Sequence, residues 1–303
     1  MSQPADVPNG PEATEAAEAT EAAEATAGAA RPAALSTLLA ARRDGTGVGF
    51  PAAVRAHVLA DPAAALDGAR AWSASPEADE RLVALEVLGA LASPWSPAPA
   101  ERVLPVLLEQ AGAGARAPQD DLRWVAAKVL AHAGAAGVEV LLGLAVDPDG
   151  DVRWQAVSSL PLVAGSPPAP EVVDGLLAAM GDADAEVRDQ AVFGLGLQLD
   201  ADTPAVRDAL SAHLDDERGD TAAQAARALA QRGDERVVPV LQRRLAPVDE
   251  DALADLEDGW VEAAADLGDA SLLPVLQALR ARPDLDPAVL EEVDTAIAAC
   301  SAS

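Results

Sequence analysis

The segment Asp182–Gly196 reads DADAEVRDQAVFGLG and combines a short acidic turn with an amphipathic helix. Its first aspartates are of a residue type that accepts hydrogen bonds from the free backbone N–H groups at a helix start. After them, Val187, Ala191 and Leu195 follow at intervals of four residues, which places them on one face of a helix. The segment therefore predicts an acidic turn that opens a helix with one apolar face.

The spacing of the central Ala and the Leu four residues later recurs along the chain. The copies are Ala84/Leu88, Ala126/Leu130, Ala156/Leu160, Ala191/Leu195, Ala225/Leu229 and Ala263/Leu267. Successive copies are 30 to 42 residues apart, and a second apolar segment precedes the copies from Ala126 onward. Two helices in each of several irregular units predict an α-solenoid, in which every unit buries its apolar faces against its neighbours.

The repeated pattern Asp-x-x-Val-Arg-x-x-Ala-x-x-x-Leu-Gly resembles HEAT repeats, specifically the short bacterial kind known as PBS-lyase or E/Z-type HEAT-like repeats. Pro105, Pro239 and Pro274 are similar to the proline often found in the first helix of such repeats. The match covers roughly 63–279, and the best-defined repeats lie within 101–267. The resemblance implies an all-α fold, a right-handed α-solenoid of the armadillo/HEAT type with about six to seven two-helix repeats.

The first thirty residues differ in composition from the rest of the chain. Glutamate recurs there at every third position from Glu12 to Glu24 among alanine and threonine, and no large apolar residue in that run is available for packing. Such a composition is typical of segments that do not fold by themselves. We therefore predict a disordered, acidic Ala/Glu-rich tail over 1–30 and a HEAT-like solenoid over 31–303.

The composition of the chain limits the kinds of partner that the protein is expected to bind. The net charge is −29, from 50 acidic and 21 basic residues, and Lys128 is the only lysine. Such acidity favours a protein partner with a basic surface or segment and opposes binding to nucleic acid and to anionic membranes. The single cysteine, Cys300, excludes an internal disulfide and is typical of a cytoplasmic protein. No membrane span and no signal peptide are expected, and a monomer is favoured.

The second helix of each HEAT repeat lines the concave surface of the solenoid. We expect the positions two residues before and two after the central Ala to face this groove, with glutamines beside them. The resulting candidates for partner binding are Trp124, Lys128, Trp154, Gln155, Asp189, Gln190, Phe193, Gln224 and Arg227. Exposed aromatic side chains on neighbouring repeats favour a binding site, because tryptophan is enriched at interface hot spots. The alternative is that these rings pack on the helix of the next repeat.

An arginine precedes the central Ala by three residues in four copies, at Arg81, Arg123, Arg153 and Arg188. These positions resemble the arginine ladder of HEAT repeats. An arginine near a helix N-terminus needs an acidic partner to be favourable there. We therefore expect a structural ladder in which the arginines pair across turns with nearby carboxylates, which are Asp120, Asp121, Asp151 and Asp184.

The sequence contains no recognisable catalytic set. His57, His132 and His213 have no metal-binding spacing, no nucleophile elbow is present, and no cofactor is implied. The best interpretation is a non-enzymatic scaffold or adaptor that binds a protein in its concave groove. The resemblance leaves one alternative open, an E/Z-type lyase or chaperone that holds a bilin-like or other apolar ligand in the groove. The HEAT-like folds that act on DNA suggest a third interpretation, which the few basic groove residues disfavour.

Overall fold

The computed structural model describes residues 31–44, 49–246, 259–283 and 285–302, and within these ranges it contains helices and no β-strand. The α-helices are α2 (Ala33–Arg43), α3 (Gly49–Ala60), α4 (Pro62–Ser73), α5 (Ala78–Ala92), α6 (Ala100–Gly114), α7 (Asp120–Leu130), α8 (Val138–Leu144), α9 (Gly150–Val163), α10 (Pro170–Ala179), α11 (Ala185–Phe193), α12 (Pro204–Ala212), α13 (Gly219–Gln231), α14 (Val238–Arg244), α16 (Trp260–Leu267), α17 (Leu273–Arg280) and α18 (Pro287–Ser301). Short 3₁₀ segments, η1 (Gly134–Gly137), η3 (Glu235–Val237) and η5 (Ala270–Leu272), precede α8, α14 and α17, and a π-helical turn, η2 (Gly194–Gln198), follows α11.

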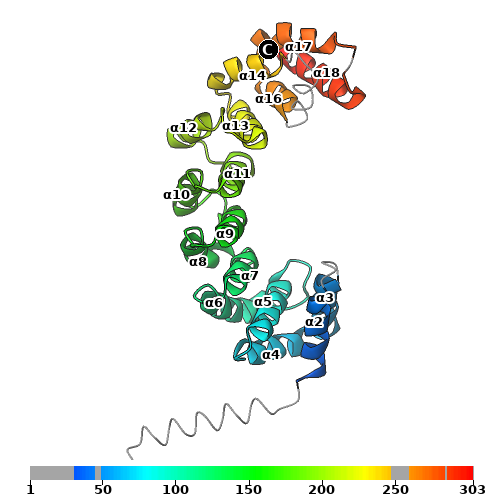
Figure 1. The fold of residues 1–303 in the computed structure, drawn as a ribbon, viewed down its shortest axis with the longest axis vertical. Coiled ribbons are helices and arrows are strands. Elements are labelled where there is room, and N and C mark those ends of the chain that lie inside the picture. The colour runs from blue at the N-terminus through cyan, green and yellow to red at the C-terminus, as the bar shows by residue number, and fades with distance from the viewer. Residues whose placement is uncertain (1–30, 45–48, 247–258, 284, 303) are drawn as a thin grey trace, which may run out of the picture.

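The helices stack in pairs along a curved solenoid. Figure 1 shows α6, α8, α10 and α12 on the outer side of the arc and α7, α9, α11 and α13 on its inner side. Successive inner helices contact one another, from α5 through α7, α9, α11 and α13 to α16 and α18. The predicted all-α solenoid of the armadillo/HEAT type is therefore confirmed, and the second helix of each repeat lines the concave surface.

The first pair, α2 and α3, departs from the regular stack. Both of its helices contact α5, the inner helix of the following pair, and both lie beside α5 in Figure 1. With this pair included, the described residues form eight helical pairs, where the repeat pattern predicts six to seven. The copy of the pattern at Ala263 and Leu267 lies on α16, and residues 247–258 before it lie outside the described residues. The predicted tail over 1–30 also lies outside them.

The acidic turns start the inner helices as predicted. Asp184 accepts a hydrogen bond from the Glu186 backbone N–H (3.0 Å), and Asp149 accepts one from the Val152 backbone N–H (3.1 Å). Each carboxylate satisfies a donor that has no partner within the helix and places negative charge at the positive end of the helix dipole. These aspartates therefore fix where α11 and α9 begin.

The repeated alanine and leucine form the core. From Ala84 to Ala263, all six central alanines are fully buried, and five of the six leucines are buried, with Leu267 partly exposed. Small residues allow the helices to approach closely. A β-carbon at Gly89 of α5 would lie 2.6 Å from a methyl carbon of Val129 on α7, and one at Gly196 would lie 2.8 Å from the β-carbon of Ala228 on α13. The core is therefore one continuous layer between neighbouring repeats. No helix in the described part of the chain is long and apolar enough to cross a membrane.

Candidate binding surface

The inner surface is not uniform at the positions expected to face the groove. Two residues before the central Ala, Trp154 is 36% exposed and Trp124 is partly buried. At the same position of other repeats, Leu82, Ala223 and Val261 are buried, which contradicts the expectation of one continuous exposed stripe. Leu82 lies on α5, against which α2 and α3 pack, and Val261 lies on α16 between α13 and α18. The accessible part of the stripe is therefore the middle of the solenoid.

Trp124 and Trp154 line one cavity on the inner surface. The cavity has a volume of about 400 Å³ and lies between the first turns of α7 and α9. Its other lining residues are Asp120, Asp121, Asp149, Asp151 and Val152. The indole ring of Trp124 packs partly against the core, whereas the ring of Trp154 extends farther into solvent. The structure thus brings together two of the predicted residues and adds four carboxylates to them.

The four carboxylates of this cavity have different surroundings. Asp149 caps α9, Asp120 accepts from the backbone N–H of Asp121 at 2.9 Å, and Asp121 lies 3.9 Å from the guanidinium of Arg42. Asp151 forms no hydrogen bond or ion pair within the described part of the chain. No cationic side chain is among the described residues that line the cavity. The local field therefore favours a cation, and the two indole faces add a cation–π attraction for it.

The two cations among the predicted groove residues are engaged within the protein. Lys128 donates to both carboxylate oxygens of Glu86 at 2.9 Å, and its ammonium lies 5.6 Å from the centre of the Trp124 ring. Arg227 binds Asp266 at 3.1 Å. Both ion pairs connect neighbouring inner helices, α5 with α7 and α13 with α16. These cations therefore contribute little net positive charge to the groove.

The remaining predicted residues lie along the inner helices outside the tryptophan cavity. Asp189 accepts a hydrogen bond from the Thr221 hydroxyl at 2.8 Å, and Gln155 donates to the Ser159 hydroxyl on its own helix at 3.2 Å. Gln190, Gln224 and Phe193 are partly buried, and none of them lines the cavity. Phe193 is therefore not part of the cavity that Trp124 and Trp154 line.

Arg123 and Arg153 connect neighbouring repeats. Arg123 donates from Nε and Nη2 to the carboxylate of Asp147 at 2.8 and 3.1 Å, and Arg153 donates in the same way to Asp182 at 2.9 Å for both bonds. Each arginine also donates to two backbone carbonyls of the turn before its own helix. Burial alone raises the pKa of Asp182, but hydrogen bonds, among which that from Arg153 is the largest, hold this pKa below its usual value.

Arg188 and Arg81 follow this pattern in part. Arg188 lies 3.6 Å from Asp216 and donates to Glu217 at 3.2 Å, whereas Arg81 donates to the backbone carbonyls of Ser75 and Pro76. The partner carboxylates differ from the expected ones, which were Asp120, Asp121, Asp151 and Asp184. An arginine in the first turns of an inner helix extends toward the acidic turn of the next repeat, so its carboxylate comes from that repeat.

Comparison with known proteins agrees with this geometry. Residues 173–259 match the model of the HEAT repeat family. This part of the chain carries HEAT repeats. The fold of the chain is similar to the crystal structure of YibA from Escherichia coli, with a TM-score of 0.69, 19% sequence identity and coverage of 100% of both chains.

The solved structures of an engineered protein and of a designed protein are also similar to this chain. An engineered protein gives a TM-score of 0.48 at 20% identity, over 90% of this chain and 79% of that one. A designed armadillo repeat protein, solved in complex with the peptide (KR)4, gives 0.41 at 18% identity, over 63% of this chain and 98% of that one. No curated protein sequence is significantly similar to this chain.

The four carboxylates of the tryptophan cavity were not predicted as site residues. Their signal was present, because Asp120 and Asp151 precede the tryptophans of their helices by four and three residues. Residues at that spacing share a helix face. Aspartates at a helix start are common as caps, so the sequence alone favours the structural role.

We expect that replacing Arg153 by alanine lowers the free energy of unfolding by about 1–3 kcal/mol, because Asp182 then stays partly buried without its partner. Unfolding in urea, followed by circular dichroism, measures the change. Arg102→Ala is the control, because Arg102 is an exposed arginine on α6. An equal loss in the two variants would show that the ladder arginine has no special structural role.

Proposed function

We propose that this HEAT-repeat protein is a non-enzymatic scaffold that binds another protein through its concave surface. In this proposal, the cavity of Trp124 and Trp154 accepts a basic side chain of the partner. The observation that supports it is the grouping of one exposed indole, Trp154, and one partly buried indole, Trp124, with four carboxylates in one cavity of about 400 Å³. A guanidinium over an indole face gains a cation–π attraction, and a neighbouring carboxylate can accept its N–H groups.

The charge of the surface favours a basic segment of a protein over nucleic acid. Four carboxylates and no cation are among the described residues that line this cavity. The phosphate groups of a nucleic acid would therefore be repelled there. The net charge of −29 would steer a basic partner toward the protein over a longer range. The lyase or chaperone alternative stays a prediction.

A defined peptide tests this proposal. We expect a fluorescein-labelled peptide of alternating arginine and serine to bind the intact protein, and the same peptide with citrulline in place of arginine to bind at least about tenfold more weakly, because citrulline lacks the charge. Fluorescence anisotropy at fixed salt concentration measures both affinities. Equal binding of the two peptides would contradict the proposal.

Matched variants separate the cavity from the general acidity of the chain. We expect Trp154→Ala and Asp151→Asn each to weaken binding of the arginine peptide by about fivefold. The control is Asp174→Asn, which removes an exposed carboxylate from the outer helix α10 and should leave the affinity unchanged. If the two carboxylate variants weaken binding equally, the peptide responds to net charge alone and the cavity is not the site.

A further inference from the structure

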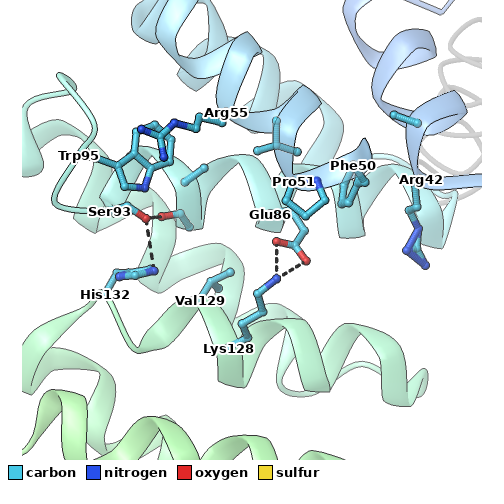
Figure 2. A pocket seen from close by; sticks show the side chains of 14 residues that line it. Arg42, Phe50, Pro51, Arg55, Glu86, Ser93, Trp95, Lys128, Val129 and His132 are labelled. Carbon is cyan, nitrogen blue, oxygen red and sulfur yellow. Dashed lines mark hydrogen bonds and ion pairs between the residues drawn. The ribbon is translucent and has the colours of Figure 1, made fainter. Parts of the chain in front are cut away.

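A second cavity lies at the N-terminal end of the concave surface, where α2 and α3 meet α5 and α7. Its volume is about 430 Å³, which is within the range of cavities that hold small organic ligands. It shares no lining residue with the tryptophan cavity. Figure 2 shows its side chains, which come from all four helices and from the segments after α5 and α7.

The walls of this second cavity are largely apolar. Phe50, Pro51 and Val54 come from α3, and Val129 comes from α7. Val54 and Val129 are buried, while Phe50 is partly exposed, so the apolar wall remains open to an incoming group. An apolar group placed against these side chains would lose contact with water, which is favourable.

Three cations and one carboxylate line the same cavity, within a chain where acidic residues outnumber basic ones by more than two to one. The carboxylate, Glu86, is bound to Lys128. The two arginines remain. Arg42 forms longer ion pairs, at 3.7 Å with Asp79 and at 3.9 Å with Asp121. Among the described residues that line this cavity, Arg55 is therefore the cation whose charge no carboxylate balances.

Arg55 is the arginine best placed to bind an anion. Its guanidinium carbon lies 4.6 Å from the centre of the Trp95 ring, and within the described residues it forms no hydrogen bond or ion pair with a carboxylate. Stacking on an indole holds the guanidinium plane and leaves its N–H edge free for a bidentate bond to a carboxylate. In Figure 2, Arg55 and Arg42 lie on opposite sides of the Glu86–Lys128 pair.

His132 and Ser93 add neutral hydrogen-bonding groups to the lining. Their Nε2 and Oγ atoms are 3.4 Å apart. Burial, and then the charge of Lys128, lower the pKa of His132. At neutral pH this imidazole is therefore uncharged, and it does not add to the positive charge of the two arginines.

We infer that this second cavity binds a carboxylate attached to a compact apolar group, with the carboxylate on Arg55 and the apolar group against Phe50, Val54 and Val129. The same chemistry is present in a free small organic acid and in the C-terminal residue of a peptide that ends in an apolar side chain. The inference does not depend on the proposed function, because the two cavities have no residue in common and bind opposite charges.

Three probes of similar size test the charge preference: 4-phenylbutyrate, 4-phenylbutanol and 4-phenylbutylamine. We expect the acid to bind at least about tenfold more tightly than the alcohol, and the amine to bind more weakly still. Isothermal titration calorimetry on the whole chain measures the three affinities. A peptide ending in phenylalanine, compared as its free acid and its amide, is the second arm of the test.

The two arms distinguish the sources of the carboxylate. Binding of phenylbutyrate supports a free organic acid, and binding of the peptide acid alone supports a protein C-terminus. The inference is overturned if the charge of the probe makes no difference in either arm, or if no probe binds.

The variant Arg55→Gln should reduce the preference of the acid over the alcohol to below about threefold, because it removes the charge that binds the carboxylate. Arg55→Lys should retain part of that preference, and Arg102→Gln, on the exposed side of α6, should leave it unchanged. A circular dichroism spectrum and a thermal melt confirm that each variant is folded. If Arg55→Gln has the same preference as the intact protein, Arg55 is not the anion-binding residue. The variant should also leave the affinity for the arginine peptide unchanged, so the two proposals can fail separately.

Discussion

Replacing Trp260 by alanine is expected to lower the free energy of unfolding by about 3–5 kcal/mol, because a fully buried large aromatic side chain leaves a cavity that its neighbours cannot fill. Trp260 is 1% exposed and is the first residue of α16, which contacts both α13 and α18. The guanidinium carbon of Arg244 lies 4.9 Å from the centre of its ring. The variant therefore loses the packing of this ring in the core and a cation–π contact.

Unfolding in guanidinium chloride, followed by circular dichroism, measures this loss, and amide hydrogen exchange locates it. Since each repeat contacts only its neighbours, exchange should increase most in α16, α17 and α18. Trp260→Phe retains most of the ring and should cost about 1 kcal/mol. Trp154→Ala is the surface control, because that ring is 36% exposed. Similar losses for Trp260→Ala and Trp154→Ala would contradict the assigned difference in burial.

The contrast between these two tryptophans shows what the sequence could predict. The spacing of Ala and Leu defines a helix face wherever it occurs, so it predicted the buried residues of the repeats from Ala84 to Leu229. Exposure on the inner surface depends on helices that come from other repeats. Leu82 is buried because α2 and α3 pack on α5, and no local pattern around Leu82 contains this information.

The arginine ladder gives a second example. The residue type and its place in the helix predicted that Arg123 and Arg153 need carboxylates, and these arginines do bind carboxylates. Pairing across turns was expected with Asp120, Asp121, Asp151 and Asp184, whereas the observed partners, Asp147 and Asp182, lie 24 and 29 residues after their arginines, in the turn of the next repeat. The distance from one repeat to the next was already visible in the pattern, so the partner could have been found by adding one repeat length.

Arg232 was not predicted at all, and its replacement by methionine is expected to lower the free energy of unfolding by about 3 kcal/mol. Its guanidinium donates to the backbone carbonyls of Leu195, Gly196, Leu199 and Ala201 in the preceding repeat, and of Ala228 in its own helix. Arg232 follows the last residue of α13 and lies outside the repeated helix pattern, so the periodicity of that pattern does not mark it.

The effect is expected to be large because Arg232 donates to carbonyl groups at the end of the π-helical turn η2. Carbonyl groups at the end of a helix have no donor within the helix, and here a half-buried guanidinium supplies donors for several of them at once. Burial lowers the pKa of Arg232, but an arginine side chain stays charged at neutral pH. With methionine at this position, the carbonyls lose their donors in a region that water reaches poorly.

Equilibrium unfolding in urea tests this role, with two further variants for comparison. Arg232→Lys keeps the charge but has fewer donors and no planar fork, so about half of the loss should remain. Arg243→Met removes an exposed arginine that pairs with the exposed Asp215, and surface pairs of this kind contribute at most about 1 kcal/mol. If Arg232→Met costs no more than Arg243→Met, the bonds to the carbonyls do not hold the two repeats together. If Arg232→Lys is as stable as the intact protein, the charge alone is sufficient and the fork geometry contributes nothing.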